Sequence, residues 1–172
     1  MQIRSLFQYL SIALALLITT EILAQQPIQQ RNPDALWMSA MDLWNKEKYA
    51  AAQKAFVELE AFYSDESSTR MADCQFYAAY CALKLYNKDA EFRFRRFIEL
   101  NPEDPRDDLA YYLLAKNNFE RKKYGKSLEW INQIDIKGLP KENLPDYYYY
   151  KGYSLFKEDL YSDALLSFSK NL

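Results

Sequence analysis

The feature that most constrains the fold of this chain is an internal repeat with a period of 37 or 38 residues. Small side chains recur in register at Ala40, Ala78, Ala115 and Gly152. A second column of small residues and a third of large apolar residues keep the same three spacings. The second column is Ala52, Ala90, Ser127 and Ala164, and the third is Phe56, Phe94, Ile131 and Phe168. Three columns that share one period indicate units that each stack on their neighbours.

Each unit contains two amphipathic stretches with helical periodicity, joined by a short polar turn. The predicted first helices span 34–46, 68–85, 107–121 and 145–158, and the predicted second helices span 48–63, 88–100, 125–134 and 162–172. Only three glycines and six prolines occur in the 172 residues, which is too few for a turn-rich all-β protein. The sequence therefore predicts an all-α fold, an α-solenoid of about four antiparallel helix hairpins, with the small residues where the helices cross.

The columns resemble the tetratricopeptide repeat, in which a bulky residue precedes a small one and A-x3-F follows in the second helix. The fourth unit carries this pattern as Tyr148-x2-Lys151-Gly152-x2-Leu155, followed by Ala164-x3-Phe168. An aromatic residue also recurs at the turn, at Tyr49, Tyr124 and Tyr161. The resemblance covers residues 34–172 and implies a right-handed superhelix with repeats near 34–66, 68–104, 105–143 and 144–172.

The N-terminus has the pattern of a secretory signal peptide. Arg4 supplies a positive charge, residues 6–20 are largely apolar, and the small residue Ala24 precedes a polar stretch. We expect a signal peptide over residues 1–24, a linker over 25–33 and the repeat array over 34–172, with an uncleaved membrane anchor as the alternative. No cysteine follows the apolar stretch directly, so the acylation site of a bacterial lipoprotein is missing. We expect an exported protein, periplasmic or associated with the outer membrane of a Gram-negative bacterium.

The composition argues against several kinds of chemistry. The chain contains no histidine, which is the usual metal ligand and neutral-pH general base. The sequence also lacks a glycine-rich phosphate loop and a Cys-x2-Cys pair. We therefore expect no enzymatic activity, no metal and no cofactor. The formal net charge of −2 argues against nucleic acid as a partner.

Two further patterns have structural interpretations. Cys74 and Cys81 lie seven residues apart on one predicted helix, about 10.5 Å along its axis. That separation is too large for a disulfide, so we expect two small buried side chains. Arg93, Arg95 and Arg96 cluster on a predicted second helix. We expect Arg96 on its solvated outer face, with binding of phosphate or anionic lipid as the alternative for the cluster.

In the tetratricopeptide family the first helices line a concave surface that binds peptides. The resemblance implies a groove formed by the first-helix residues that do not serve the hairpin crossing. These are Trp37, Met41 and Trp44, then Gln75, Ala79 and Ala82, then Tyr112, Lys116 and Phe119, and finally Tyr149, Tyr153 and Phe156. Such an aromatic surface suits a peptide segment, and sugar rings would also stack on it. The alternative for Trp37 and Trp44 is packing against the N-terminal segment or a neighbouring helix.

Together these patterns predict an exported protein–protein interaction scaffold with a protein or peptide partner. Membrane contact is expected only through the N-terminal signal or an envelope complex. Two other functions stay open: a glycan-binding helical-repeat protein, and the periplasmic sensory region of a larger receptor. The last predicted helix is apolar and carries no polar cap. We therefore expect either that the chain continues past Leu172 or that another surface covers this face.

Overall fold

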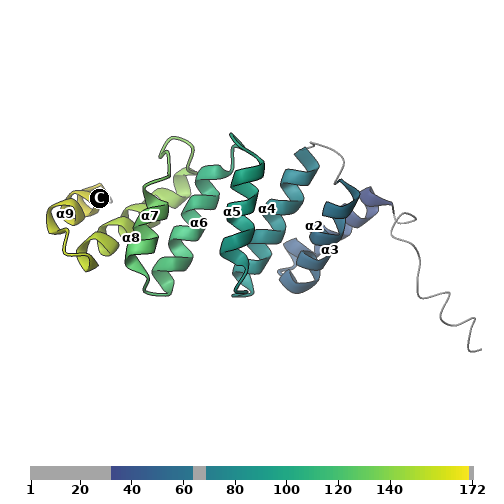
Figure 1. Cartoon of the computed structure of the whole chain (residues 1–172), viewed down its shortest axis with the longest axis horizontal. Coiled ribbons are helices and arrows are strands. Elements are labelled where there is room, and N and C mark those ends of the chain that lie inside the picture. The colour runs from purple at the N-terminus through teal and green to yellow at the C-terminus, as the bar shows by residue number, and fades with distance from the viewer. Residues whose placement is uncertain (1–31, 64–68, 171–172) are drawn as a thin grey trace, which may run out of the picture.

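A computed structural model describes residues 32–63 and 69–170 of the chain. Within these residues it contains eight α-helices and a short 3-10 helix, and no strand. The helices stand side by side in one row, with α2 and α3 at one end of the molecule and α9 at the other (Figure 1). Neighbouring helices pack in contact along the row. The predicted all-α solenoid of helix hairpins is confirmed.

The first helices of the four hairpins are α2 (Pro33–Asn45), α4 (Thr69–Lys84), α6 (Asp107–Glu120) and α8 (Leu144–Lys157). The second helices are α3 (Tyr49–Phe62), α5 (Ala90–Leu100), α7 (Tyr124–Ile131) and α9 (Tyr161–Ser169), and the 3-10 helix η2 (Lys141–Asn143) precedes α8. Most ends agree with the predicted ranges to within two residues. The exceptions are the C-terminal ends of α7 and α9, which are each three residues shorter than predicted.

Each hairpin turns through the same backbone motif. Glu47, Tyr86, Lys122 and Asp159 have left-handed backbone, with φ of 55°, 56°, 60° and 62°. The following amide donates to the carbonyl oxygen five residues earlier, as from Lys48 to Leu43 and from Lys123 to Asn118, both at 2.9 Å. This is the Schellman pattern that ends many helices, usually with glycine at the left-handed position. The repeat is therefore present in the backbone as well as in the side chains, although none of the four residues is glycine.

The columns of small residues lie where the two helices of a hairpin meet. All eight small residues are buried, and Ala40, Ala52 and Ser127 have no exposed surface. The Ser127 hydroxyl donates to the Ala115 carbonyl at 2.9 Å, so the two columns touch directly in the third hairpin. In the fourth hairpin the Phe168 ring lies against Gly152. Small side chains at these positions let the two backbones approach, and the large apolar column fills the space beside them.

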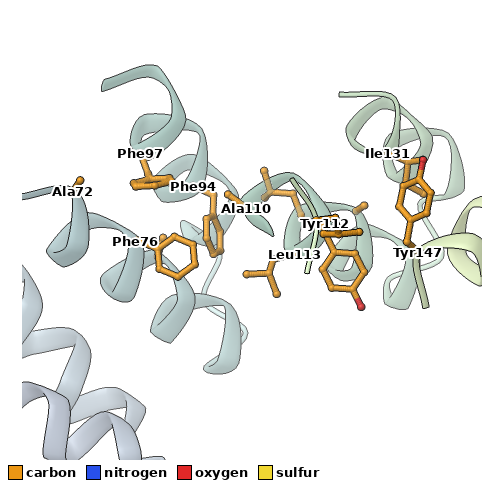
Figure 2. Packing of buried hydrophobic residues seen from close by; sticks show 13 residues of the cluster. Ala72, Phe76, Phe94, Phe97, Ala110, Tyr112, Leu113, Ile131 and Tyr147 are labelled. Atoms are coloured by element: carbon orange, nitrogen blue, oxygen red, sulfur yellow. The ribbon is translucent and has the colours of Figure 1, made fainter. Parts of the chain in front are cut away.

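The buried side chains form two clusters along the row. The first joins α2 and α3 to α4 through Phe56, Leu59 and Cys81. The second runs from α4 to α8, and Figure 2 shows the rings of Phe76, Phe94 and Phe97 grouped at one end and Ile131 beside Tyr147 at the other. Tyr77 packs against both clusters. The core is therefore continuous along the array, as expected when no hairpin can bury its apolar face alone.

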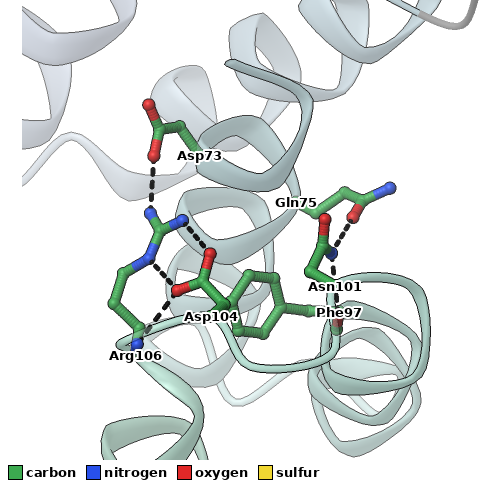
Figure 3. Close-up of polar contacts among 6 residues, drawn as sticks. All are labelled: Asp73, Gln75, Phe97, Asn101, Asp104 and Arg106. Atoms are coloured by element: carbon green, nitrogen blue, oxygen red, sulfur yellow. Dashed lines mark hydrogen bonds and ion pairs between the residues drawn. The ribbon is translucent and has the colours of Figure 1, made fainter. Parts of the chain in front are cut away.

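The junction between α5 and α6 is held by a polar network around Arg106 (Figure 3). The guanidinium group donates to Asp73 on α4 at 2.7 Å and to both carboxylate oxygens of Asp104, at 2.8 and 2.7 Å. It also lies over the rings of Phe76 and Phe97, at 5.0 and 5.4 Å from their centroids. Arg106 thereby connects α4, α5 and the loop before α6, where α5 and α6 themselves share little contact.

Cys74 and Cys81 are both fully buried on α4 and do not form a disulfide, as predicted. None of the helices in residues 32–63 and 69–170 has the length and hydrophobicity of a membrane-spanning segment. The predicted signal peptide (1–24) and most of the predicted linker (25–33) lie outside the described residues.

Candidate functional site

The predicted groove residues on α2 are engaged in packing. The Trp44 ring contacts Tyr77 and Tyr80 of α4, with centroid distances of 5.1 and 4.6 Å. The Trp37 ring contacts Phe56 and Tyr77 at 5.8 and 6.1 Å, and the Arg70 guanidinium lies 4.7 Å from its centroid. Trp37, Met41 and Trp44 are all half-buried. Trp37 and Trp44 therefore pack against a neighbouring helix, which is the alternative interpretation of these residues.

Gln75 and Tyr112 are buried, so the prediction that they face an open groove is wrong. Gln75 is 6% exposed and its side-chain oxygen accepts a hydrogen bond from Asn101 at 2.7 Å. Tyr112 is 3% exposed and its hydroxyl donates to Asp146 at 3.3 Å. Ala79 and Ala82, also predicted to face the groove, have no exposed surface. Both helices have neighbours on two sides, since α4 packs against α3 and α5 and α6 packs against α7 and α8.

The exposed part of the predicted groove lies on α8. Tyr149 and Phe156 are 44% and 47% exposed, and Tyr153 is half-buried between them. These residues occupy positions i, i+4 and i+7 of the helix, so they share one face. Phe119 of α6 lies beside this face, with ring centroids 5.8 Å from Tyr149 and 5.5 Å from Tyr153.

Two turn residues extend this surface. Tyr124 at the start of α7 lies 5.7 Å from both Phe119 and Tyr153, and Tyr161 at the start of α9 lies 5.6 Å from Phe156. We call these six residues the distal aromatic patch: Phe119, Tyr124, Tyr149, Tyr153, Phe156 and Tyr161. The sequence predicts four of the six as groove residues. It predicts Tyr124 and Tyr161 only as aromatic residues of the turn, without a link to the groove.

The turn residues join the groove through a pair of aromatic side chains that recurs in the repeat. Trp44 and Tyr49, Phe119 and Tyr124, and Phe156 and Tyr161 meet edge to face, at 5.6, 5.7 and 5.6 Å. In the second hairpin the equivalent residues are Ala82 and Asn87, and the Asn87 amide instead donates to Gln53 at 3.2 Å. The pair therefore belongs to the repeat. Its two residues are always five apart in the sequence, so the groove column and the turn column taken together could have predicted it.

The electrostatics of the distal aromatic patch combine one ammonium group with several hydroxyls. The Lys157 nitrogen lies 5.4 Å from the Tyr153 centroid and 5.8 Å from that of Phe156. The Tyr161 hydroxyl donates to Asp159 at 2.6 Å, and this bond raises the Tyr161 pKa. Lys116, the predicted cation of the groove, is half-buried on α6. The patch offers flat apolar rings with hydroxyl groups at their edges, a surface that suits peptide side chains. The Lys157 ammonium group could pair with an acidic group of the ligand.

The arginine cluster on α5 lies beside a separate pocket of about 230 Å³, lined by Glu60, Gln75, Asp89, Phe92, Arg93 and Arg96. Arg93 donates to Asp89 at 2.6 Å, and Arg96 lies 3.9 Å from Glu60. Arg95 lies 3.9 Å from Glu99. Since each of these arginines has a carboxylate within 4 Å, the cluster provides little net positive charge for an anionic ligand.

The described residues contain no group of three metal-ligating side chains that could hold an ion. Burial raises the pKa of each cysteine thiol, Cys74 and Cys81, to about 12. Neither thiol is therefore available as a thiolate nucleophile near neutral pH. The arrangement that remains is an apolar and aromatic surface suited to binding.

One family model matches the chain over residues 29–130, and its description is YfiO, an outer membrane lipoprotein. The match includes the first two hairpins, α6 and most of α7, and ends before α8. No curated protein matches the chain. In this chain the two cysteines are buried in α4, so neither can carry a lipid while the array is folded.

Proposed function

Because the chain belongs to the outer membrane lipoprotein family YfiO and is therefore an exported protein of the cell envelope, we propose that it is a non-catalytic scaffold for protein–protein interaction. Its partner would be a protein or peptide segment that binds on the first helices of the array. The observation that carries this proposal is the distal aromatic patch, in which Tyr149, Phe156 and Tyr161 remain between 44% and 58% exposed.

The domain organisation is part of the same proposal. We infer a signal peptide over residues 1–24, a linker over 25–33 and tetratricopeptide-type repeats over 34–172. The small-residue columns and the recurring ring pair support this assignment, since both keep the period of the repeat. The outer membrane setting suggests partners in an envelope complex.

The distal aromatic patch is a better candidate than the rest of the predicted groove because its rings are accessible without rearrangement. Aromatic rings that pack on each other lose little conformational entropy when a partner binds, so most of the apolar contact contributes to affinity. Each fully covered ring contributes roughly 1.5–3 kcal/mol. Residues such as Tyr112, whose ring is 3% exposed, can offer a partner no such area.

The test uses the purified chain as bait in envelope extracts, with the Tyr149→Ala and Tyr153→Ala double variant beside it. Both residues lie on the patch and are partly exposed, so the variant should fold, as thermal unfolding by circular dichroism would verify. We expect the double variant to lose the partner that the unaltered chain retains. The matched control is Phe92→Ala on α5, which is 67% exposed and lies off the patch.

Retention of the same partner by the double variant would contradict the proposed site. A glycan array run in parallel addresses the other class of ligand. Binding of a glycan that the double variant abolishes, with no protein partner recovered, would assign the patch to carbohydrate instead.

A further inference from the structure

The pocket between α3, α4 and α5 is separate from the distal aromatic patch. Its volume is about 230 Å³, and its lining consists of Glu60, Gln75, Asp89, Phe92, Arg93 and Arg96. This volume is below the roughly 300–1,000 Å³ of sites that hold drug-sized ligands. The pocket therefore suits a small ligand with a single ring.

The repeat explains why there is space at this position. Arg93 stands 37 residues before Trp130, the equivalent residue of α7. The Trp130 ring packs against the core and stacks on Tyr111 of α6, with ring centroids 6.1 Å apart. The Arg93 side chain instead turns to Asp89 on its own helix, and its Nε atom donates to that carboxylate at 2.6 Å. The second hairpin thus has a pocket with an arginine at its edge, where the third hairpin has a packed ring.

The carboxylate of Glu60 is an acceptor at this pocket. Only 16% of its side chain is exposed, and the Arg96 guanidinium lies 3.9 Å away, beyond hydrogen-bond distance. Among the described residues, none donates a hydrogen bond to this carboxylate. Burial raises the pKa of Glu60, although the charges of Arg96 and Arg93 act to lower it. A ligand that donates a hydrogen bond to this desolvated carboxylate would therefore be stabilised.

The side-chain amide of Gln75 supplies the complementary donor. Gln75 is 6% exposed on α4, and its Oε1 atom accepts a hydrogen bond from Asn101 at 2.7 Å. The amide nitrogen points away from Asn101, and no residue in 32–63 or 69–170 accepts a hydrogen bond from it (Figure 3). An amide N–H group in such a confined position is costly to leave without an acceptor, so an oxygen atom of the ligand would bind favourably there.

The charges of the pocket favour an uncharged ligand. Two guanidinium groups, of Arg93 and Arg96, accompany two carboxylates, of Asp89 and Glu60. Arg93 is paired with Asp89 at 2.6 Å, and Arg96 lies 3.9 Å from Glu60, so a charged ligand would have to compete with one of these pairs. A hydroxyl group fits better, because it can donate to a carboxylate and accept from an amide at the same time.

Phe92 adds an apolar wall to these polar groups. It is 67% exposed although it lines the pocket, so part of its ring is free to contact a ligand. A sugar ring meets both requirements, because its C–H groups pack on an aromatic ring while its hydroxyl groups bond to polar side chains. We propose that this pocket binds one neutral saccharide unit, with C–H groups against Phe92 and adjacent hydroxyl groups at Glu60 and Gln75.

The test titrates the full chain separately with glucose, galactose, mannose, N-acetylglucosamine and the zwitterion glycine. Proton–nitrogen correlation spectra report on the side-chain amide of Gln75 during each titration. For a ligand of this size we expect a dissociation constant on the order of 1 mM. At least one of the sugars should shift the Gln75 amide signals in a saturable way, and glycine should not.

Two variants test the residues that line the pocket. Glu60→Gln should weaken sugar binding by about tenfold or more, because a hydrogen bond to a charged group is lost. Phe92→Ala should weaken it by about fivefold, because the apolar wall is removed. The matched control is Leu100→Ala on the same helix, which is 56% exposed, does not line the pocket and should leave binding unchanged. Circular dichroism verifies that each variant is folded.

The proposal would be overturned if none of the sugars gave a saturable shift. It would also be overturned if a sugar bound the unaltered chain, Glu60→Gln and Phe92→Ala with equal affinity. Saturable binding of glycine without binding of any sugar would assign the pocket to a zwitterion and would likewise reject the proposal.

This inference does not depend on the proposed function of the distal aromatic patch. The Tyr149→Ala and Tyr153→Ala double variant should bind the sugar as the unaltered chain does, even where it loses its protein partner. Loss of sugar binding in that double variant, with binding retained by Glu60→Gln, would place the sugar on the patch and would reject the pocket.

Discussion

Gly152 is the member of its column that has no side chain, and the Phe168 ring occupies the space beside it. A Cβ atom at Gly152 would lie 2.7 Å from a ring carbon of Phe168, closer than packed atoms approach. Gly152→Val should therefore force α9 away from α8 and lower the free energy of unfolding by about 1–3 kcal/mol. Urea denaturation followed by circular dichroism measures this change.

Gly125 provides the control, because its added Cβ would meet the Glu158 carboxylate at an ordinary 3.5 Å. Gly125→Ala lies in the first turn of α7 and should raise the free energy of unfolding by up to about 1 kcal/mol through helix propensity. If both substitutions stabilise the chain by similar amounts, the close approach at Gly152 is not a constraint.

Asp107 carries a carboxylate whose Oδ1 atom is buried without a hydrogen-bond partner. Burial, and then the nearby charges of Asp104 and Asp108, raise its pKa from 3.8 to about 6. The ionised form therefore destabilises the folded chain above pH 6, and the penalty is relieved as the pH falls through 6 toward 3.8. Asp107→Asn should raise the free energy of unfolding at pH 7 by on the order of 1 kcal/mol, after allowance for solvent screening.

Urea titrations of Asp107→Asn and the unaltered chain at about pH 7 and about pH 4.5 check this prediction. The difference between the two proteins should be largest at the higher pH and should shrink toward the lower one. A difference independent of pH would contradict it. Asp108→Ala is the control, because Asp108 accepts a hydrogen bond from the Asp135 amide at 2.7 Å, and its loss should destabilise the chain.

At the scale of elements, the junction between α5 and α6 depends on one side chain. Arg106 makes its bonds to Asp73 and Asp104 while only 22% of its side chain is exposed. Burial acts to raise the pKa of Asp104, but the bonds from Arg106 outweigh it and hold that pKa below its usual value. Arg106→Ala should lower the free energy of unfolding by about 2–3 kcal/mol, because two carboxylates lose a charged partner. Arg106→Lys should recover little of this, since an ammonium group lacks the planar fork.

The matched control is Arg96→Ala on α5. Arg96 is 52% exposed and lies 3.9 Å from Glu60, so its loss should change stability by less than about 1 kcal/mol. Equal effects of Arg106→Ala and Arg96→Ala, measured by urea denaturation, would show that the Arg106 network does not hold the junction.

The positions of the helices could be predicted from the sequence because the columns repeat and because Pro, Asn, Asp and Ser separate the units. The Arg106 network could not, since it joins residues 33 positions apart that belong to no column. Gln75 and Tyr112 illustrate the same limit, because the residues that contact them lie 26 and 34 positions later in the chain. Asn101, at the end of α5, bonds to Gln75, and Asp146 of α8 bonds to Tyr112.

At the scale of the whole molecule, the aromatic residues of the predicted groove fall into two sets, those that pack against a following helix and those that are exposed. Trp37 and Trp44 pack against α4, whereas Tyr149 and Phe156 on α8 are exposed. At α8 the predicted groove residues Tyr149, Tyr153 and Phe156 share one face of the helix, and Tyr149 and Phe156 are exposed there. The sequence could not distinguish the packed set from the exposed set, because burial between repeats depends on tertiary contacts that no single unit encodes.

Membership of a lipoprotein family contrasts with the placement of the cysteines in this chain. Cys74 and Cys81 are fully buried in α4 between α3 and α5. Attachment to the outer membrane through either sulfur is therefore incompatible with the folded array.

The most direct measurement is site-specific photo-crosslinking in intact cells that produce the full chain. Replacement of Tyr149 by p-benzoylphenylalanine puts the photoreactive group on the distal aromatic patch, and replacement of Phe92 puts it on an accessible surface of α5. If the patch binds the partner, Tyr149 should yield a discrete crosslinked envelope protein and Phe92 should yield none. The same product from both positions, or a product from Phe92 alone, would contradict the proposed binding surface.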